Sequence, residues 1–457
     1  MKTHLFSIQE RERAQLTHKL LPFNPKSIIK LLIINLYTLT IILTSCSVDL
    51  DSGNGVKTMT TGAEHTVALK DDGTLWAWGR NDNYVQLGLG DTTNRNSPEQ
   101  IEINKIYYPS AIDTDWIAVS SLGYCTVALK EDGSLWTWGV NGRGQLGNES
   151  IPTGVGGRSD TPVPVKRSGV IDRDWEMASA GSQQIVALKK DGSLWAWGDN
   201  NYGQLGRGSH DGTAHSNPTE LLGADSNGKP FKDYRWKTVS AGNSHIVAIK
   251  DDGTLWAWGN NEYGQLGKGD GYSANTIDNW EPAKIEINKA NYKDAIDTDW
   301  FAVFAGSMHT VAIKTDGSLW AWGRNDGGQL GDGTGGDDTD VNNKPTPVPV
   351  KINGVIDKDW ESVSGGLNHT IAHKRNGTLW AWGKNGDGQL GLGDKIIRTI
   401  PTRLGVAADL VGVSAGEKHS AALRRSGILW TWGSNGYGQL GDGTTNDRSR
   451  PGVVKWE

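Results

Sequence analysis

The 457-residue sequence has little sulfur and few phenylalanines: two cysteines, four methionines and five phenylalanines. Two cysteines cannot build a disulfide framework or a cysteine-rich metal site, so the core must stabilise the fold. No apolar run reaches the ~18 residues that a membrane-spanning helix needs. No stretch has the pattern of a long amphipathic or coiled-coil helix, which disfavours a helical or α/β protein. The 61 glycines show no G-x-y period, and this excludes collagen.

The sequence also lacks an excess of basic residues beyond its N-terminus. Residues 1–45 hold six lysines or arginines and two acidic residues, so 40 basic and 50 acidic residues follow and carry a net charge of −10. This part of the chain, residues 46–457, therefore lacks the excess of positive charge that binds the phosphate backbone of nucleic acid. Nucleic acid is therefore not an expected partner.

The N-terminus has the features of an export signal. Lys26 and Lys30 precede a mostly apolar run of 13 residues, Leu31 to Leu43. That length is typical of a signal-peptide core. The next residues complete the string Leu43-Thr44-Ser45-Cys46, which resembles the lipobox of bacterial lipoproteins. In that family the cysteine thiol is acylated and becomes the mature N-terminus.

This resemblance predicts how the chain is placed in the cell. We expect a lipoprotein signal peptide over residues 1–45, acylation at Cys46 and a flexible tether over 46–55. The body would be attached to a bacterial membrane, in the periplasm or at the cell surface. A plain secretory signal with a chance cysteine is the alternative, and the long polar stretch before Lys26 leaves a downstream translation start open.

Internal repetition indicates the architecture. Seven W-A-W-G or W-T-W-G strings recur at intervals of 50 to 64 residues and contain 14 of the 21 tryptophans. A period of this length is typical of repeat folds. The strings begin at Trp76, Trp136, Trp195, Trp256, Trp320, Trp380 and Trp430.

Each repeat predicts four short strands. Two segments rich in β-branched and aromatic residues flank an Asp-Gly or Asn-Gly turn in most copies, which predicts a hairpin. W-x-x-V and P-x-x-I segments on either side add two strands, and a proline at the start of the last one suits an edge strand. Seven such units of about 59 residues predict an all-β, seven-bladed β-propeller over residues 56–457, with one repeat per blade. A linear β-solenoid is the alternative, but its rungs are shorter and it needs atypical capping repeats.

The whole unit, W-x-x-V-x-A-G-x-x-H-T-x-A-L-K-x-D-G-x-L-W-x-W-G-x-N-x-x-G-Q-L-G, resembles the repeat of the regulator of chromosome condensation family. The resemblance covers Val56 to Trp456 and implies a seven-bladed propeller. The family's name-giving activity is nucleotide exchange on a nuclear GTPase, together with chromatin binding. An exported, acidic body contradicts both, so guanine-nucleotide exchange is not expected.

One plant member of that family senses ultraviolet-B light through tryptophans in G-W-R-H-T segments. The matching segments here contain no tryptophan, so the W-x-W pairs are interpreted as core residues rather than chromophores. Those segments are Gly62-Ala63-Glu64-His65, Gly242-Asn243-Ser244-His245 and Gly306-Ser307-Met308-His309.

Comparison of the copies indicates a duplication and a way of closing the ring. The segment from Ile101 to Trp116 returns as the segment from Ile285 to Trp300, so repeats 1–3 were duplicated as a block to give repeats 4–6. Five repeats begin with a tryptophan, whereas the first has Val56 in its place. We predict that Trp456, near the C-terminus, packs beside Val56 and supplies the missing indole.

A repeated histidine invites a metal hypothesis. Neighbouring blades lie about 10 Å apart, whereas zinc needs its ligands about 2 Å away. We therefore interpret these histidines as structural residues that satisfy backbone groups, and we expect no metal and no cofactor. They are His65, His245, His309, His369 and His419, and the second and third repeats have Cys125 and Gln184 instead.

Two further features of the sequence bear on chemistry. An acidic insert holds Asp332, Asp337, Asp338 and Asp340, which we interpret as solvated, although calcium binding around Asp337 stays open. The chain has no nucleophile elbow, no H-E-x-x-H motif and no phosphate-binding glycine loop. We expect that the protein is not an enzyme.

The remaining candidate is a surface. The Asp-Gly turns lie on one face, so the G-x-x-H corners and the N-x-x-G-Q-L-G loops must lie on the other. Residues that vary between copies concentrate there, and tyrosine and arginine on a rigid scaffold are typical of protein-binding surfaces. Several of these tyrosines could instead pack between loops of adjacent blades. The predicted partner-binding residues are Tyr124, Tyr202, Tyr263, Met308, Arg80, Arg143 and Arg324.

Three hypotheses follow. The leading one is a monomeric, lipid-anchored scaffold that binds an unidentified protein or another envelope macromolecule through this face. The second is a periplasmic enzyme with a site at the mouth of the central tunnel. The third is a purely structural surface protein.

Overall fold

The computed structural model describes residues 55–225, 228–269, 278–336, 342–405 and 409–456. The predicted signal peptide, Cys46 and all but the last residue of the predicted tether lie outside these ranges. Within the ranges, no helix is both long enough and apolar enough to cross a membrane.

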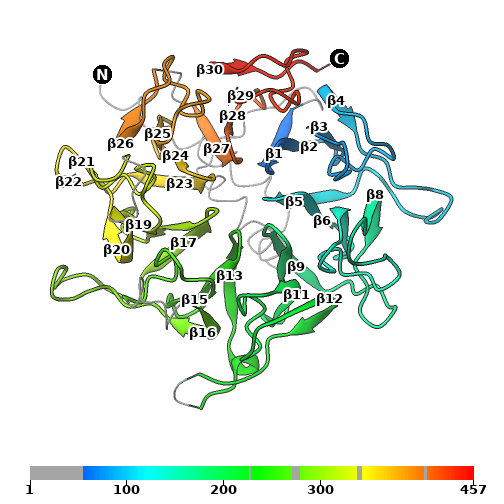
Figure 1. Cartoon of the computed structure of the whole chain (residues 1–457), viewed down its shortest axis with the longest axis horizontal. Helices are drawn as coiled ribbons and strands as arrows, with labels where there is room; N and C mark the ends of the chain where they lie inside the picture. The colour runs from blue at the N-terminus through cyan, green and yellow to red at the C-terminus, as the bar shows by residue number, and fades with distance from the viewer. Residues whose placement is uncertain (1–54, 226–227, 270–277, 337–341, 406–408, 457) are drawn as a thin grey trace, which may run out of the picture. The chain divides into compact units, whose positions relative to one another are not determined.

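Seven four-stranded antiparallel sheets are arranged as the blades of a propeller (Figure 1). Each sheet contains four strands that are consecutive in the chain, so one sequence repeat forms one blade. The all-β, seven-bladed propeller predicted from the repeats is confirmed. Strand β1, at the start of the body, packs against the last blade, which makes the ring continuous.

The strands occupy four equivalent places in the blades. The first, innermost strands are β1 (Val56–Thr61), β5 (Trp116–Ser121), β9 (Trp175–Ala180), β13 (Trp236–Ala241), β17 (Trp300–Ala305), β23 (Trp360–Gly365) and β27 (Leu410–Ala415). The second strands are β2 (His65–Lys70), β6 (Cys125–Lys130), β10 (Gln184–Lys189), β14 (His245–Lys250), β18 (His309–Lys314), β24 (His369–Lys374) and β28 (His419–Arg424). The third strands are β3 (Leu75–Gly79), β7 (Leu135–Val140), β11 (Leu194–Asn200), β15 (Leu255–Gly259), β19 (Leu319–Gly323), β25 (Leu379–Gly383) and β29 (Leu429–Gly433). The fourth, outer strands are β4 (Arg95–Gln100), β8 (Arg158–Pro164), β12 (Asp211–Glu220), β16 (Asn279–Lys284), β20 (Lys344–Pro349), β26 (Arg398–Arg403) and β30 (Arg448–Val453). A small hairpin of β21 (Lys351–Ile352) and β22 (Val355–Ile356) and a 3₁₀ turn, η1 (Phe231–Asp233), lie between blades.

Burial explains the sequence of the second strands. Neighbouring blades cover both faces, so six consecutive residues such as His65–Lys70 are buried and the strand does not alternate between apolar and polar residues. The outer strands are more exposed and carry the repeated proline. We expected this proline at the start of the strand, but Pro282 is the fourth residue of β16. The outer strand extends further toward its N-terminal end than the P-x-x-I pattern indicated, and its proline is tolerated because this edge has no further strand to pair with.

The second tryptophan of each W-x-W pair connects its blade to the preceding blade. Trp138 Nε1 in the second blade donates to the carbonyl oxygen of Gln86 in the first blade, at 3.0 Å. The same bond closes the ring, where Trp78 donates to Gln439 at 3.0 Å. All seven interfaces have it, and the glutamine always comes from the Q-L-G loop. A buried indole N–H needs an acceptor, and this carbonyl provides it.

The repeated histidines also bond across blade interfaces. His309 Nε2 lies 3.0 Å from Thr370 Oγ1 of the next blade, and that hydroxyl donates to the carbonyl of Gln329 at 2.8 Å. Burial lowers the pKa of the five histidines to about 3 or about 4, so their rings are neutral. Their predicted structural role is right, but their predicted partners are wrong, because the partners are side-chain hydroxyls rather than backbone groups. The other pairs are His65–Thr126, His245–Thr310, His369–Ser420 and His419–Thr66.

Two blades lack this histidine, and the second blade changes two other positions as well. A Cβ on Gly306 would lie 2.5 Å from His309 Cε1, so the glycine makes room for the ring. In the second blade the smaller Cys125 replaces histidine, and Leu122 replaces the glycine. Ile185 of the third blade replaces the hydroxyl residue and shares an apolar cluster with Cys125. In the third blade Gln184 replaces the histidine and Ile246 of the fourth blade replaces the hydroxyl, whereas Gly181 is retained. Histidine and hydroxyl are therefore retained or replaced together, and the glycine changes only in the second blade.

The first and last blades meet through the same kinds of contact as the others. Val56 N donates to Gly427 O at 3.2 Å, and Thr61 Oγ1 lies 2.8 Å from Ser414 Oγ. Trp456 packs on the apolar cluster that contains Val56. The predicted position of Trp456 beside Val56 is confirmed.

Candidate protein-binding face

Two opposite faces follow from the strand order. The corner-and-loop face holds the corners between first and second strands, such as residues 62–64, and the loops between third and fourth strands, such as residues 80–94. The hairpin face holds the turns between second and third strands and the connections from one blade to the next. This division of the faces agrees with the one expected from the sequence.

Backbone bonds fix each loop to the corner of its own blade. Arg80 N donates to Glu64 O at 2.9 Å, and the equivalent bond is present in all seven blades. The buried loop asparagine closes the turn, since Leu87 N donates to Asn81 Oδ1 at 3.0 Å and the other six copies do the same. The loops therefore hold their variable side chains on a rigid frame.

The loop glutamine fixes the variable position itself. In six blades its side-chain oxygen accepts a hydrogen bond from the backbone N–H two residues earlier. Those N–H groups include the ones of Arg143, Tyr202 and Tyr263, three of the predicted binding residues. The repeat thus separates a constant backbone from side chains that differ from blade to blade.

Arg80 and Tyr124 belong to one cluster that spans blades 7, 1 and 2. Arg80 pairs with Glu64 at 2.5 Å and lies over the rings of Tyr84 and Tyr437, at 4.8 and 4.6 Å. Tyr84 stacks on Tyr124 with ring centroids 4.2 Å apart. Burial, with the nearby carboxylates of Glu417 and Glu64, raises the pKa of Tyr124 to about 12.

Met308, Arg324 and Tyr263 form a second cluster, at the junction of blades 4 and 5. Arg324 Nη1 lies 3.3 Å from Met308 Sδ, and Arg324 Nη2 pairs with Asp326 at 2.8 Å. The guanidinium lies 4.9 Å from the ring centroid of Tyr263. Tyr124 and Tyr263 thus pack between loops of adjacent blades, as the alternative interpretation had it, and remain half-exposed.

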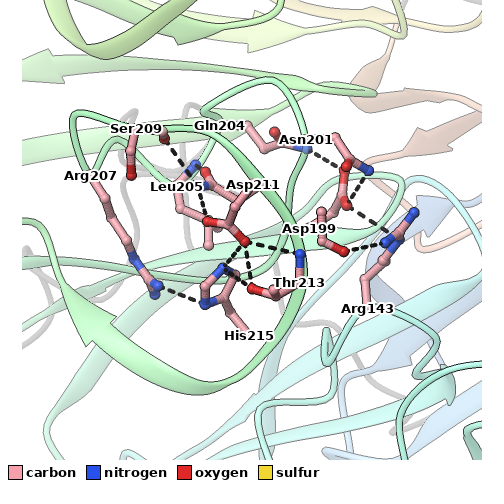
Figure 2. Close-up of polar contacts among 12 residues, drawn as sticks. Arg143, Asp199, Asn201, Gln204, Leu205, Arg207, Ser209, Asp211, Thr213 and His215 are labelled. Atoms are coloured by element: carbon pink, nitrogen blue, oxygen red, sulfur yellow. Dashed lines mark hydrogen bonds and ion pairs between the residues drawn. The ribbon is translucent and has the colours of Figure 1, made fainter.

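Arg143, in the loop of the second blade, contacts the third blade (Figure 2). Arg143 Nε is 3.3 Å from Asp199 Oδ1, and Arg143 Nη1 donates to the carbonyl of Gly212 at 2.9 Å. Tyr202, in the same third-blade loop as Asn201, is 40% exposed. The structure therefore brings five of the seven predicted residues into two clusters, places Arg143 and Tyr202 elsewhere on the same face, and does not bring the seven into a single patch.

A polar chain in the third blade was not predicted. Arg207 Nη1 lies 2.9 Å from His215 Nδ1, and His215 Nε2 lies 2.9 Å from Asp211 Oδ1 (Figure 2). Burial acts to raise the pKa of Asp211, but hydrogen bonds from Thr213, Asn200 and the histidine outweigh it and lower that pKa. Because arginine can only donate, His215 accepts at Nδ1 and donates at Nε2. Neither ring nitrogen is left to act as a base, so this chain orders the loop.

The described part of the acidic insert gives no evidence of a cation site. Asp332 accepts hydrogen bonds from Asn325 and Thr334 and lies 3.3 Å from Lys344 Nζ. Asp337, Asp338 and Asp340 lie outside the described residues. In the part of the chain that is described, no three His, Cys, Asp or Glu side chains are placed to hold a metal ion.

Comparison with known proteins agrees with this architecture. The model of the RCC1-like domain matches residues 107–457, and models of the regulator of chromosome condensation (RCC1) repeat match residues 56–84 and 72–129. The ultraviolet-B receptor UVR8 of Arabidopsis thaliana is 30% identical over 352 residues, which are 76% of this chain and 70% of UVR8. The human E3 ubiquitin-protein ligase HERC2 is 28% identical over 68% of this chain, but the chain spans 6% of HERC2.

A solved structure shows the same fold. The crystal structure of Prp20p from Saccharomyces cerevisiae has a TM-score of 0.66 and 21% identity, covering 91% of this chain and 90% of that one. The repeats, the seven blades and these matches together show that the chain belongs to the regulator of chromosome condensation (RCC1) repeat family.

Proposed function

We propose that this protein is a lipid-anchored scaffold of the bacterial cell envelope that binds another protein through its corner-and-loop face. The observation that carries the proposal is the division of that face into a constant frame and variable side chains. Each loop is tied to its corner and closed by its asparagine, while the side chains at the tip are arginine, tyrosine, aspartate or none. Preorganised loops lose little entropy on binding, and exposed tyrosine and arginine are common binding anchors.

Relatives support a role in protein binding. The work on yeast Prp20p describes its binding to Gsp1p and histones, and another structure shows Kap60 bound to yeast RCC1. Gsp1p, histones and Kap60 are partners of the yeast proteins and are not assigned to this chain. For this chain the acidic body and the predicted export signal favour a protein or other macromolecule of the envelope.

The binding face is tested by capture from envelope extracts. The full chain in mild detergent is compared with a variant in which Tyr124, Tyr202 and Tyr263 are all replaced by alanine. The matched control is Tyr107→Ala, because Tyr107 is 74% exposed and lies on the hairpin face. We expect a saturable partner that the triple variant loses and the control keeps. Equal capture by both variants would contradict the proposed face.

The anchor is tested separately by Cys46→Ser. This change removes the acyl acceptor, so we expect the body to be released or to accumulate as an uncleaved precursor. A variant that is still processed and still labelled by fatty acid in the membrane fraction would show that Cys46 is not the anchor.

A further inference from the structure

The hairpin face carries the end of the body from which the predicted tether starts. Asp71 N, in the first hairpin turn, donates to Gly55 O at 2.9 Å, and Val56 N donates to Gly427 in the last turn. Residues 46–55 number ten, and ten extended residues span at most ~36 Å. If Cys46 is acylated, as the proposed function has it, the hairpin face lies within this distance of the membrane.

A rigid loop on that face presents large apolar side chains to solvent. It connects β4 to β5, the strands of the first and second blades (Figure 1). Ile106 is 87% exposed, Tyr107 is 74% exposed and Ile112 is 56% exposed. The backbone is nevertheless ordered, since Tyr107 N donates to Asn104 O at 3.2 Å and Ile103 N donates to Asp113 Oδ1 at 2.9 Å. Nothing in the folding of this loop requires its exposed positions to be apolar.

The duplicated copy of this loop provides an internal comparison. Residues 287–297 repeat the same frame, because Ile287 N donates to Asp297 Oδ1 at 2.9 Å and Tyr292 packs on Trp320 as Tyr108 packs on Trp136. The exposed pair is different, since Ala290 and Asn291 stand where the first loop has Ile106 and Tyr107. Lys293 and Asp294 likewise replace Pro109 and Ser110. The first loop thus has apolar residues at 106 and 107 where the second has a small and a polar one, while both loops expose an isoleucine, Ile112 and Ile296, to the same extent.

Other exposed apolar side chains lie on the same face. Among the large apolar residues with high exposure in the described ranges, three are in loops of the corner-and-loop face: Val155, Tyr202 and Ile396. The turns and connections of the hairpin face hold Ile106, Tyr107, Ile112, Val170, Leu222, Ile296, Val355 and Ile428.

We propose that the hairpin face rests on the lipid surface, with Ile106 and Tyr107 entering the interface between headgroups and acyl chains. Tyrosine favours this interface because its ring is apolar and its hydroxyl is polar. Exposed isoleucine gains free energy when it leaves water for lipid. Three hairpin turns, including the first with Asp71 and Asp72, carry acidic pairs, so we assign the contact to the apolar side chains and not to attraction for anionic lipid. The corner-and-loop face then points away from the membrane, toward a partner.

The test places an environment-sensitive fluorophore on the loop. The full chain carries Ile106→Cys, and Cys125 does not react because it is fully buried. The labelled protein is anchored in phosphatidylcholine vesicles, with and without spin-labelled acyl chains. The matched control is Ala290→Cys in the duplicated loop. We expect a blue shift and quenching by the spin-labelled lipid at position 106 and neither at position 290.

A second variant examines the side chains themselves. With the fluorophore at Ile112→Cys, the double change Ile106→Ala and Tyr107→Asn copies the second loop. We expect it to remove the quenching at position 112. If positions 106 and 290 give the same spectrum, or if position 106 is quenched only after a protein partner is added, the inference is wrong.

Failure of the anchor is distinguishable from failure of this inference. A chain that does not associate with vesicles shows that Cys46 does not carry lipid. The same fluorophores are then read on a chain that also carries Cys46→Ser, so that no free thiol competes for the label, and that is held to a nickel-chelating lipid by a histidine tag placed before residue 46. Position 106 must still contact lipid there, and an aqueous spectrum at that position would overturn the inference while leaving the binding face unaffected.

Discussion

Trp456 lies edge-on to Trp78, with ring centroids 5.8 Å apart and an angle of 82° between the rings. It has the same relation to Trp76, again at 5.8 Å. In the third blade Trp175, from the first strand, lies 6.0 and 5.9 Å from the corresponding pair. Lys70 covers both Trp76 and Trp456, as Lys189 covers its own pair. The last residues of the chain therefore complete the aromatic cluster of the first blade.

Removal of this indole should weaken the closure of the ring. We expect Trp456→Ala to lower the free energy of unfolding by about 2–4 kcal/mol, toward the lower part of the range for core aromatics because Trp456 is half-buried. This free energy of unfolding is measured by urea denaturation. Trp280→Ala is the matched control, since that indole is 41% exposed at the outer rim, and its effect should be small. Equal losses for both variants would show that Trp456 has no special part in closure.

The combination of Leu122, Cys125 and Ile185 in the second blade predicts a rescue. Gly306→Leu alone should cost more than ~3 kcal/mol, because its Cβ would lie 2.5 Å from His309 Cε1. Adding His309→Cys and Thr370→Ile copies the combination found at Leu122, Cys125 and Ile185. The triple variant should recover most of the lost stability. A triple variant that is less stable than the single variant would show that these three positions are not coupled.

The buried histidines predict acid sensitivity. Their pKa values in the folded protein, about 3 or about 4, lie below the value of 6.5 for the unfolded chain. Between these values the unfolded chain binds more protons, so stability falls as the pH falls from 6.5 toward 3. Each histidine contributes up to ~1.4 kcal/mol per pH unit.

The interface between blades 4 and 5 can be made less sensitive to acid by giving it the residue pair of another blade interface. His245→Gln with Thr310→Ile copies Gln184 and Ile246, the pair at the junction of blades 3 and 4. Thermal unfolding between pH 7 and pH 4 should show a shallower dependence than in the parent protein. An unchanged slope would mean that His245 takes up no proton on unfolding in this range.

Lys250 predicts a dependence of stability on pH in the same direction as the histidines, but at higher pH. Its Nζ is 3.3 Å from the ring centroid of Trp256 and has no hydrogen-bond partner among the described residues, because Arg235 stands where the fifth blade has Asp299. Burial lowers the pKa of Lys250 to about 7, so stability rises with pH between 7 and the unfolded value of 10.5.

Replacement of this lysine should stabilise the protein. At pH 6 we expect Lys250→Met to raise the free energy of unfolding by an amount on the order of 1–3 kcal/mol, and the gain should shrink above pH 7. Lys314→Met is the control, because Lys314 pairs with Asp299 at 2.5 Å and its loss should destabilise. Destabilisation by both changes would show that Lys250 has a partner in solution.

Sequence repetition was enough to predict the blades, their strands and the closing contact of Trp456, because seven aligned copies expose which positions are structural. It could not predict the partners of the histidines. Those bonds join His309 to Thr370, from different repeats, and pairing across an interface leaves no local pattern. The grouping of Arg80 with Tyr124 and of Arg324 with Met308 depends on which loops adjoin, and the chain of Arg207, His215 and Asp211 depends on the long outer strand β12.

The division between a binding face and a membrane face is tested most directly by photo-crosslinking in living cells. Benzoylphenylalanine is placed at Tyr202 on the corner-and-loop face and, in a second strain, at Tyr107 on the hairpin face. The account predicts a discrete protein adduct from position 202 and none from position 107, which should contact lipid. A protein adduct from position 107 with none from position 202 would contradict it.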